Sequence, residues 1–184
     1  MKNNHINFLS HFEEKGISSI FTNHGDYDNK FDYFLRYLSK KYNIINDEED
    51  IDVLSELDKF KNTTVLVLKP TNFGYDDGSG EQPWQMKSRY ILKIRDKSIN
   101  NNLSIILFTY SYKTQYKNNE IDNNQMTLSN FVIEYKDNKI HIHKNRYGDN
   151  ESFDIELLKP LWLNEQREDK LKRILKHKLK YNIV

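Results

Sequence analysis

Apolar residues recur at helical spacing in the first third of the chain. Phe31, Phe34, Leu35, Leu38 and Tyr42 lie at i, i+3, i+4, i+7 and i+11, which predicts an amphipathic helix. An aspartate just before this segment is the expected N-cap residue, and both Asp26 and Asp28 are candidates. Shorter stripes predict two more helices, one that ends before Gly16 and one that follows Asn46 (Phe8, Leu9 and Phe12; Ile51, Leu54, Leu57 and Phe60).

The middle of the chain has the patterns of β-strands. Residues 63–68 and 103–112 are apolar on both faces, which predicts buried strands, and we place the second of them centrally in the sheet. Residues 88–95 alternate between apolar and polar side chains, which predicts a strand buried on one face. Two further strands are expected on either side of Asp137-Asn138, a pair that favours a tight hairpin turn (residues 128–136 and 139–144).

The end of the chain is again predicted to be helical, from about residue 164 to 181. Its apolar stripe consists of Leu171, Ile174, Leu175 and Leu179. The simplest assembly is a single α+β domain that spans residues 1–184. It contains N-terminal helices, an antiparallel β-meander of about five strands and a C-terminal amphipathic helix.

Composition narrows the classes of function. The chain has no Cys, which excludes disulfide and thiolate chemistry, and no apolar run approaches the roughly 20 residues of a membrane helix. We therefore expect a cytoplasmic protein with no membrane partner. The excess of Asn and Lys (22 each) and of Ile (18), with no Ala, is typical of an AT-rich genome such as that of a phage or another mobile element. This bias lowers the weight that any cluster of Lys or Asn carries.

Glu134, His141 and His143 share the outer face of the predicted hairpin. A two-residue turn pairs Tyr135 with Ile140 and Glu134 with His141, because strand side chains alternate between faces. The inward face then holds Phe131, Ile133, Tyr135, Ile140 and Ile142. Two histidines beside a carboxylate suit a divalent metal or an acid–base pair. The alternative is a solvated sheet face that carries no chemistry.

The triplet Glu134-Tyr135-Lys136 also has the acidic-x-Lys spacing of many metal-dependent nucleases. Such nuclease sites also contain an upstream acidic residue that shares the metal, and Asp76 or Asp77 could serve in this role. In a chain with 30% charged residues such a triplet has little specificity. A metal-dependent hydrolase or nuclease centred on the His-x-His hairpin is therefore an alternative hypothesis, and a divalent metal is its implied cofactor.

Residues 71–85 form the longest clear loop, and the segment 73–81 within it matches no phosphate-binding or EF-hand motif. Its adjacent carboxylates would repel phosphate. Aromatic side chains are enriched at protein interfaces, so the loop is instead a candidate partner-binding site, formed by Tyr75, Asp76, Asp77 and Trp84. The alternative is a plain acidic turn.

Charge is unevenly distributed although the formal net charge is only +1. Residues 1–80 carry 9 basic and 14 acidic residues, whereas residues 161–184 carry 7 and 3. The basic end could bind nucleic acid through Arg167, Lys170, Lys172, Arg173, Lys176 and Lys180. A solvated helix face is the alternative interpretation of the same residues.

No coherent catalytic set emerges from these patterns. We therefore expect a non-enzymatic cytosolic interaction protein without a cofactor, of the inhibitor or immunity type, that binds and blocks a partner protein. Separated acidic and basic ends favour this hypothesis, since electrostatic complementarity gives fast and selective association. The metal-dependent hydrolase and the nucleic-acid-binding module remain the alternatives.

Overall fold

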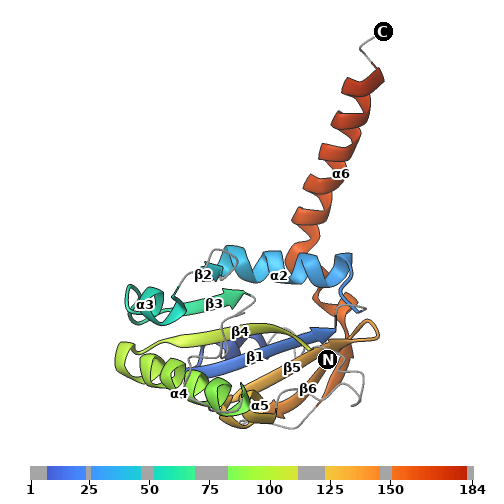
Figure 1. The fold of residues 1–184 in the computed structure, drawn as a ribbon. Helices are drawn as coiled ribbons and strands as arrows, with labels where there is room; N and C mark the ends of the chain where they lie inside the picture. Colours follow the sequence, from blue (N-terminus) through green and yellow to red (C-terminus); the bar gives the residue numbers. More distant parts are fainter. Residues whose placement is uncertain are drawn as a thin grey trace.

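The computed structural model describes residues 8–23, 26–46, 52–68, 83–111, 123–145 and 151–181, which form a seven-stranded sheet flanked by helices (Figure 1). The strand order is β2-β3-β4-β1-β5-β6-β7. The strands are β1 (Gly16–Asn23), β2 (Asn43–Asn46), β3 (Thr64–Leu68), β4 (Ser104–Ser111), β5 (Phe131–Lys136), β6 (Lys139–Asn145) and β7 (Ser152–Asp154). The helices are η1 (Phe8–Glu13), α2 (Asn29–Lys41), α3 (Val53–Leu57), α4 (Pro83–Asn101), α5 (Asn123–Leu128), η3 (Ile155–Leu158) and α6 (Lys159–Tyr181).

The sheet is mostly parallel, so the predicted α+β class with an antiparallel meander is wrong. β2, β3, β4, β1 and β5 run parallel to their neighbours. Among the described strands, the antiparallel pairs are β5–β6 and β6–β7. Helices between the strands make this arrangement possible, since a parallel pair needs a crossover connection whereas an antiparallel pair can close with a short turn. The architecture is therefore α/β with an antiparallel edge.

The largest error concerns β1, the central strand, which lies in the part of the chain predicted to be all helical. Its apolar residues are interrupted by Ser18, Ser19 and Thr22, all of which are buried. Hydrogen bonds satisfy two of these polar groups: Ser19 Oγ lies 2.7 Å from Ser129 Oγ, and Thr22 Oγ1 donates to the Tyr135 carbonyl at 3.1 Å. Polar residues that find their partners only in the folded sheet conceal a buried strand from pattern analysis.

The predicted strand 88–95 is also wrong, because these residues belong to α4. Ile91, Ile94 and Ser98 are buried at helical spacing, whereas Leu92 is 44% exposed. The short edge strand β2 was predicted as a link between helices. Residues 47–51, at the start of the predicted helix that follows Asn46, lie outside the described residues. So does most of the loop 71–85.

Other predictions are confirmed. α2 buries Phe31, Phe34, Leu35 and Leu38 and has Asp28 as its N-cap. Asp137 and Asn138 have φ values of 51° and 62°, as a tight hairpin turn requires. β5 and β6 pair in the predicted register, with Tyr135 opposite Ile140 and Glu134 opposite His141.

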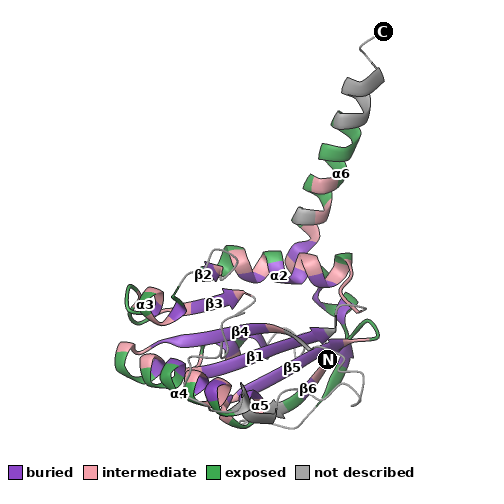
Figure 2. Cartoon of the chain, in the orientation of Figure 1, coloured by how far each residue is buried: buried purple, intermediate pink, exposed green. Residues whose placement is uncertain are grey.

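Each face of the sheet has its own hydrophobic core, and buried residues concentrate in the central strands (Figure 2). On one face, η1, α2, η3 and the first turns of α6 pack on residues such as Ile20, Ile106 and Ile133. On the other face, α3 and α4 pack on Val65, Ile105 and neighbouring residues. All five of the predicted inward hairpin residues lie in the first core.

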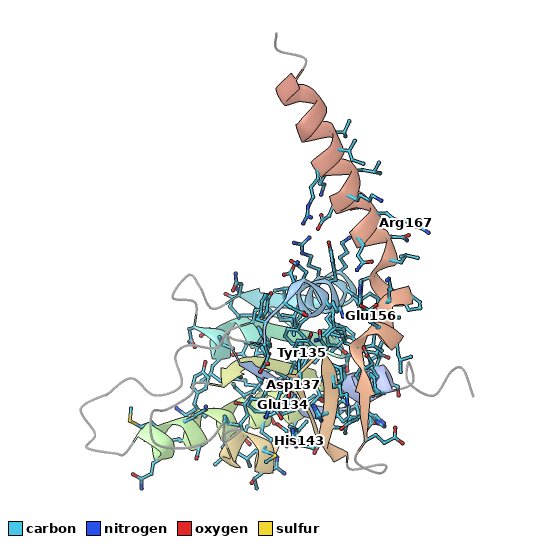
Figure 3. The ribbon with its side chains drawn as sticks, turned by 90° about the vertical axis from the view of Figure 1, so that its right-hand side faces the viewer. Glu134, Tyr135, Asp137, His143, Glu156 and Arg167 are labelled. Carbon is cyan, nitrogen blue, oxygen red and sulfur yellow. The ribbon has the colours of Figure 1, made fainter. Side chains whose placement is uncertain are left out.

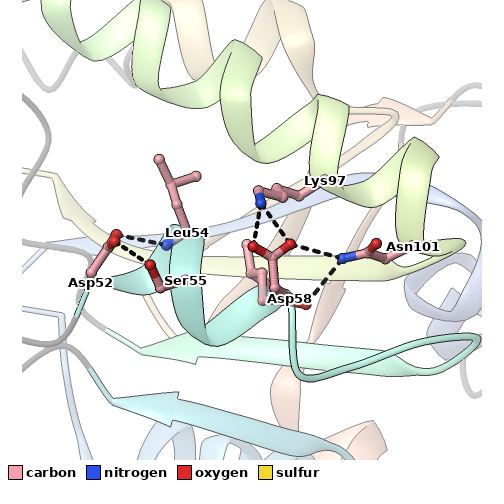
Figure 4. A network of polar contacts seen from close by, with 7 residues as sticks. Asp52, Leu54, Ser55, Asp58, Lys97 and Asn101 are labelled. Carbon is pink, nitrogen blue, oxygen red and sulfur yellow. Dashed lines mark hydrogen bonds and ion pairs between the residues drawn. The ribbon is translucent and has the colours of Figure 1, made fainter.

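Polar contacts join α3 to α4 (Figure 4). The Asp58 carboxylate accepts hydrogen bonds from Lys97 and, at 3.3 Å, from the Asn101 amide. The hydrogen bond from Lys97 lowers the pKa of Asp58. Asp52 caps α3 by accepting from the Leu54 amide at 3.1 Å and from the Ser55 hydroxyl. These contacts hold the short α3 against the end of α4.

The first turns of the C-terminal helix α6 pack on α2, and the rest of the helix projects from the body of the molecule (Figure 1). Trp162, 1% exposed, interrupts its helical geometry with φ −122° and ψ 15° and packs on Phe34. None of the helices in the described segments is both long and apolar enough to cross a membrane.

Candidate functional site

The carboxyl ends of the parallel strands define the first candidate site. From β1 the chain passes through α2 to β2 at one edge of the sheet, whereas from β4 it passes through α5 to β5 on the other side of β1. Connections that leave in opposite directions create a topological switch point beside β1. In open α/β sheets, ligands bind at such a point, outside the carboxyl ends of the strands.

The N-terminus of α2 lies at this switch point, and the chain's own carboxylate occupies it. Asp28 Oδ1 accepts hydrogen bonds from the backbone amides of Lys30, at 3.0 Å, and Phe31, at 2.9 Å. These are two of the free amides that make a helix N-terminus a binding site for anions. A bound phosphate would have to displace the Asp28 carboxylate from them.

The ammonium group of Lys30 is engaged as well. Its Nζ lies 3.0 Å from Glu156 Oε1 in η3. The hydrogen bond with Glu156 raises the pKa of Lys30 and lowers the pKa of Glu156. The amide of Ile155 donates to the Asn138 carbonyl at 3.1 Å, so η3 sits against the hairpin turn. Figure 3 shows Glu156 at the base of α6.

Tyr135, at the end of β5, lies beside Asp28 at this candidate site. Its ring is 1% exposed and stacks on Phe31 with centroids 4.6 Å apart and an interplanar angle of 5°. Burial raises the pKa of Tyr135, and a hydrogen bond with Asp28 raises it further. The phenol of Tyr135 therefore stays neutral and lines the site beside the Asp28 carboxylate.

The second candidate is the hairpin with Glu134, His141 and His143. Glu134 is buried, with 8% exposure, and its Oε2 lies 2.7 Å from His143 Nε2. The β5–β6 register shifts so that Ile133 pairs with Ile142 and Val132 with Lys144, which leaves His143 as the extra residue of a β-bulge.

His141 is engaged elsewhere. Its Nδ1 lies 2.9 Å from Ser152 Oγ of β7, and the two histidine rings are 6.4 Å apart. In the described segments, no group of three or more His, Cys, Asp or Glu side chains could hold a metal ion. Lys136 pairs with Lys139 next to the turn. The geometry thus pairs Glu134 with one histidine and not with two.

The remaining predicted site residues fall into two groups. Tyr75, Asp76 and Asp77 lie outside the described residues, and of Trp84 only the backbone, in the first turn of α4, is described. On α6 the side chains of Arg167, Lys170, Lys172 and Arg173 are exposed. Lys176 and Lys180 belong to the same helix, and their side chains are outside the described part.

Sequence reasoning identified Asp28 as a cap but gave it no functional role, and it did not single out Lys30 or Glu156. These residues come from opposite ends of the chain, and nothing in their local pattern relates them. The only local signal for Lys30 is its place in the first turn of a helix that follows a strand. That strand, β1, is not evident from its sequence pattern.

Comparisons with known proteins bear on the fold. No protein-family model matches the sequence, and no curated protein matches it either. Among solved structures, the chain is similar to a DnaB-like replicative helicase that was determined together with its interactions with primase, with a TM-score of 0.51 and 8% identity over 77% of this chain. This chain spans 56% of the length of that helicase chain. A structure of the RadB recombinase is also similar, with a TM-score of 0.44 and 9% identity over 76% of this chain and 87% of the other.

The likeness to the helicase concerns the fold alone, which is a RecA-like α/β fold. It overturns the α+β class. It also does not fit the expected inhibitor or immunity-type α+β protein.

Proposed function

We propose that this chain is a non-enzymatic interaction protein that binds another protein through a RecA-like α/β scaffold and binds no nucleotide at its switch point. The observation that carries the proposal is the Asp28 carboxylate, which accepts the amide hydrogens of Lys30 and Phe31 at the start of α2. P-loop proteins use the amides of a glycine-rich loop and a lysine at the start of the following helix to hold phosphate. Here both kinds of donor are bound to carboxylates of the chain itself.

The sequence between β1 and α2 supports the same conclusion. Residues 23–31 read Asn-His-Gly-Asp-Tyr-Asp-Asn-Lys-Phe, with one glycine and no Ser or Thr after the lysine. A phosphate-binding loop has the pattern Gly-x-x-x-x-Gly-Lys-Ser/Thr, in which glycines let the backbone approach the phosphates and the hydroxyl holds Mg²⁺. Asp26 and Asp28 add negative charge where a phosphate would have to enter.

A scaffold without nucleotide chemistry still offers surfaces for recognition. The similar helicase was studied for its interactions with primase, a contact between two proteins. Protein binding by this chain needs neither a metal nor a nucleotide, and we place it in the cytoplasm. The candidate loop of Tyr75, Asp76, Asp77 and Trp84 remains part of this proposal as a partner-binding element.

Nucleotide binding tests the first half of the proposal. Isothermal titration of the full chain with Mg·ATP is expected to show no binding tighter than about 1 mM. A dissociation constant in the micromolar range that is lost in Lys30→Ala would contradict it. Lys15→Ala serves as the matched control. Lys15 directly precedes β1, at the end of that strand opposite to the switch point.

Affinity purification of the tagged full chain from its native source tests the second half. A protein partner in stoichiometric amount is expected, and its purified form should bind the purified chain. Recovery of nucleic acid with no stoichiometric protein would reject the proposal.

Nucleic-acid binding by α6 is the second candidate function. The observation in its favour is the exposure of Arg167, Lys170, Lys172 and Arg173 on one projecting helix. Binding through phosphate contacts must strengthen as salt is lowered. A fluorescence anisotropy titration with mixed DNA and RNA at low salt tests it, and absence of binding there would remove this candidate.

A further inference from the structure

The projecting part of α6 carries an apolar stripe that is exposed on the described surface of the chain. Leu171 is 59% exposed, Ile174 44% and Leu175 58%. Their spacing of i, i+3 and i+4 places all three on one side of the helix. The other exposed large apolar residues of the described segments, Ile44, Leu92, Ile99 and Leu157, are at least seven residues apart in sequence. Three within five residues form a surface.

The base of α6 is held in place while the stripe is left free. Trp162 is buried in the core beneath α2, and Arg36 of α2 binds Asp169 with Nη1 and Oδ2 2.9 Å apart. The stripe begins two residues beyond this contact, where the helix leaves the body (Figure 1). The helix is thus fixed at one end and presents its apolar side to the surroundings.

A cavity at the base extends this surface. Its volume is about 390 Å³, and it lies between α2, β2 and α6, with Ser39, Lys40, Ile44 and Lys172 among its lining residues. Ile44 is 43% exposed and lies on β2, the edge strand of the sheet. A partner that covers the stripe can therefore also reach an apolar side chain of the body.

Charge decides what kind of partner fits. Lys170, Lys172 and Arg173 surround the stripe, are exposed and form no ion pair within the described residues. The sequence continues with Lys176, Lys178 and Lys180 and contains no carboxylate after Asp169. Two copies of this helix side by side would bring like charges together, which disfavours a second copy of the chain. A nucleic-acid backbone would satisfy the cations but would leave the leucines in water.

We propose that α6 is a docking helix, whose stripe of Leu171, Ile174 and Leu175 inserts into an apolar groove of a partner protein with carboxylates along its rim. Amphipathic helices bind partners in this way, with anchors at i, i+3 and i+4. The apolar anchors supply the affinity, and the surrounding cations supply the selectivity for an acidic rim. This inference rests on the proposed function and identifies its surface and its class of partner.

Binding to the purified partner, first recovered with the wild-type full chain, tests the inference. The stripe variant Leu171→Glu/Leu175→Glu should raise the dissociation constant at least about 10-fold. The control Leu92→Glu/Ile99→Glu, which makes the same change at exposed apolar positions of α4, should leave it unchanged. A third variant, Lys170→Gln/Arg173→Gln, should weaken binding at low salt and reduce its salt dependence. Circular dichroism and thermal midpoints of all three variants should match the wild type, because every changed side chain is exposed.

Each other outcome overturns the inference in a distinguishable way. Equal binding of the partner by the stripe variant would reject α6 as the surface and leave the proposed function standing. No stoichiometric protein with the wild-type chain would reject both. A dimer in analytical ultracentrifugation that the stripe variant abolishes would assign the stripe to a second copy. Binding to vesicles of anionic phospholipid or to duplex DNA that is lost in the stripe variant would assign it to a lipid surface or to nucleic acid.

Discussion

Lys30 Nζ and Glu156 Oε1 lie 3.0 Å apart, and this pair joins the first turn of α2 to η3 across the switch point of the sheet. The two residues come from opposite ends of the chain. Lys30 lies at the start of the helix that follows the central strand, where a RecA-like P-loop protein directs a lysine at phosphate. In this chain the lysine is directed at a carboxylate of its own C-terminal part. The same ion pair links α2 to η3, the segment that directly precedes α6.

Asp28→Ala should lower the free energy of unfolding by about 1 kcal/mol, because it removes the side chain that caps the Lys30 and Phe31 amides. Urea denaturation followed by circular dichroism measures this change. Asp28→Asn is the matched control, since asparagine caps helices about as well as aspartate. Equal losses in both variants would show that the charge of Asp28, and not its hydrogen bonds, is what stabilises this site.

Gly16→Ala should destabilise the chain by about 2 kcal/mol or more. Gly16 has φ +124°, a backbone conformation that residues with a Cβ rarely adopt, and an added Cβ would lie 2.2 Å from Asn130 Nδ2. Asn130 has little freedom to move, because its amide donates to the Lys15 carbonyl at 3.0 Å. Thermal and urea unfolding measure the loss.

A double variant separates the two causes at Gly16. In Gly16→Ala/Asn130→Ala the steric conflict with Asn130 is relieved and only the backbone strain remains, so the combined loss should be smaller than the sum of the single losses. Additive losses would mean that contact with Asn130 is not part of the reason for a glycine here.

Gln125→Met should cost about 1–3 kcal/mol of stability, because Gln125 is fully buried and its amide donates to Ser19 Oγ at 3.0 Å and Thr109 Oγ1 at 3.2 Å. Loss of the amide leaves the buried Ser19 hydroxyl of β1 and the partly buried Thr109 hydroxyl of β4 with fewer partners. Chemical denaturation provides the measurement. In the background Thr109→Val the same substitution should cost less, and an unchanged cost would show that the two side chains do not act as a unit.

Glu13 should contribute a small pH-dependent stability. The hydrogen bond from Lys41, with Nζ and Oε1 2.6 Å apart, lowers the pKa of Glu13 below its ordinary value of 4.5. The contribution is therefore fully present above pH 4.5 and is lost as the pH falls through the lower value of the folded state. About half of the Glu13 side chain is exposed, so we expect only about 0.5 kcal/mol.

The measurement for Glu13 is the difference in free energy of unfolding between wild type and Glu13→Gln, obtained from urea denaturation at about pH 6 and about pH 3. The difference should be present at the higher pH and vanish at the lower. Glu14→Gln is the neighbouring control. A difference that persists at the lower pH would mean that packing of Glu13, and not its charge, stabilises the fold.

Local patterns predicted the elements whose signals are local. α2 was correct because its apolar stripe and its cap lie within one stretch of sequence, from Asp28 to Leu38. The hairpin register was correct because a two-residue turn at Asp137-Asn138 fixes the pairs from Lys136–Lys139 to Ile133–Ile142, and the register shifts only beyond them. The helix α6 was correct because its stripe and its charges repeat along the chain.

Elements whose partners are distant in sequence were not predicted. The central strand β1 contains the buried polar residues Ser19 and Thr22, whose hydrogen-bond partners come from distant parts of the chain: Gln125, Ser129 and the Tyr135 carbonyl. Residues 88–95 of α4 show both an alternating pattern, which suggests a strand, and a helical spacing. The folded chain follows the helical spacing, because it buries Ile91, Ile94 and Ser98. Errors in these two elements were enough to turn a mostly parallel sheet into a predicted antiparallel meander.

For this protein, the sequence alone determined the absence of thiol chemistry, the amphipathic helices, the hairpin and the basic character of its last helix, because each depends on composition or on neighbours within a few residues. The tertiary structure decided the strand order, the union of Lys30 with Glu156 and the pairing of Glu134 with a bulged His143. It also decided that the stripe on α6 is exposed. Parallel pairing and contacts across the sheet join segments far apart in sequence, and only the folded chain brings them within reach of one another.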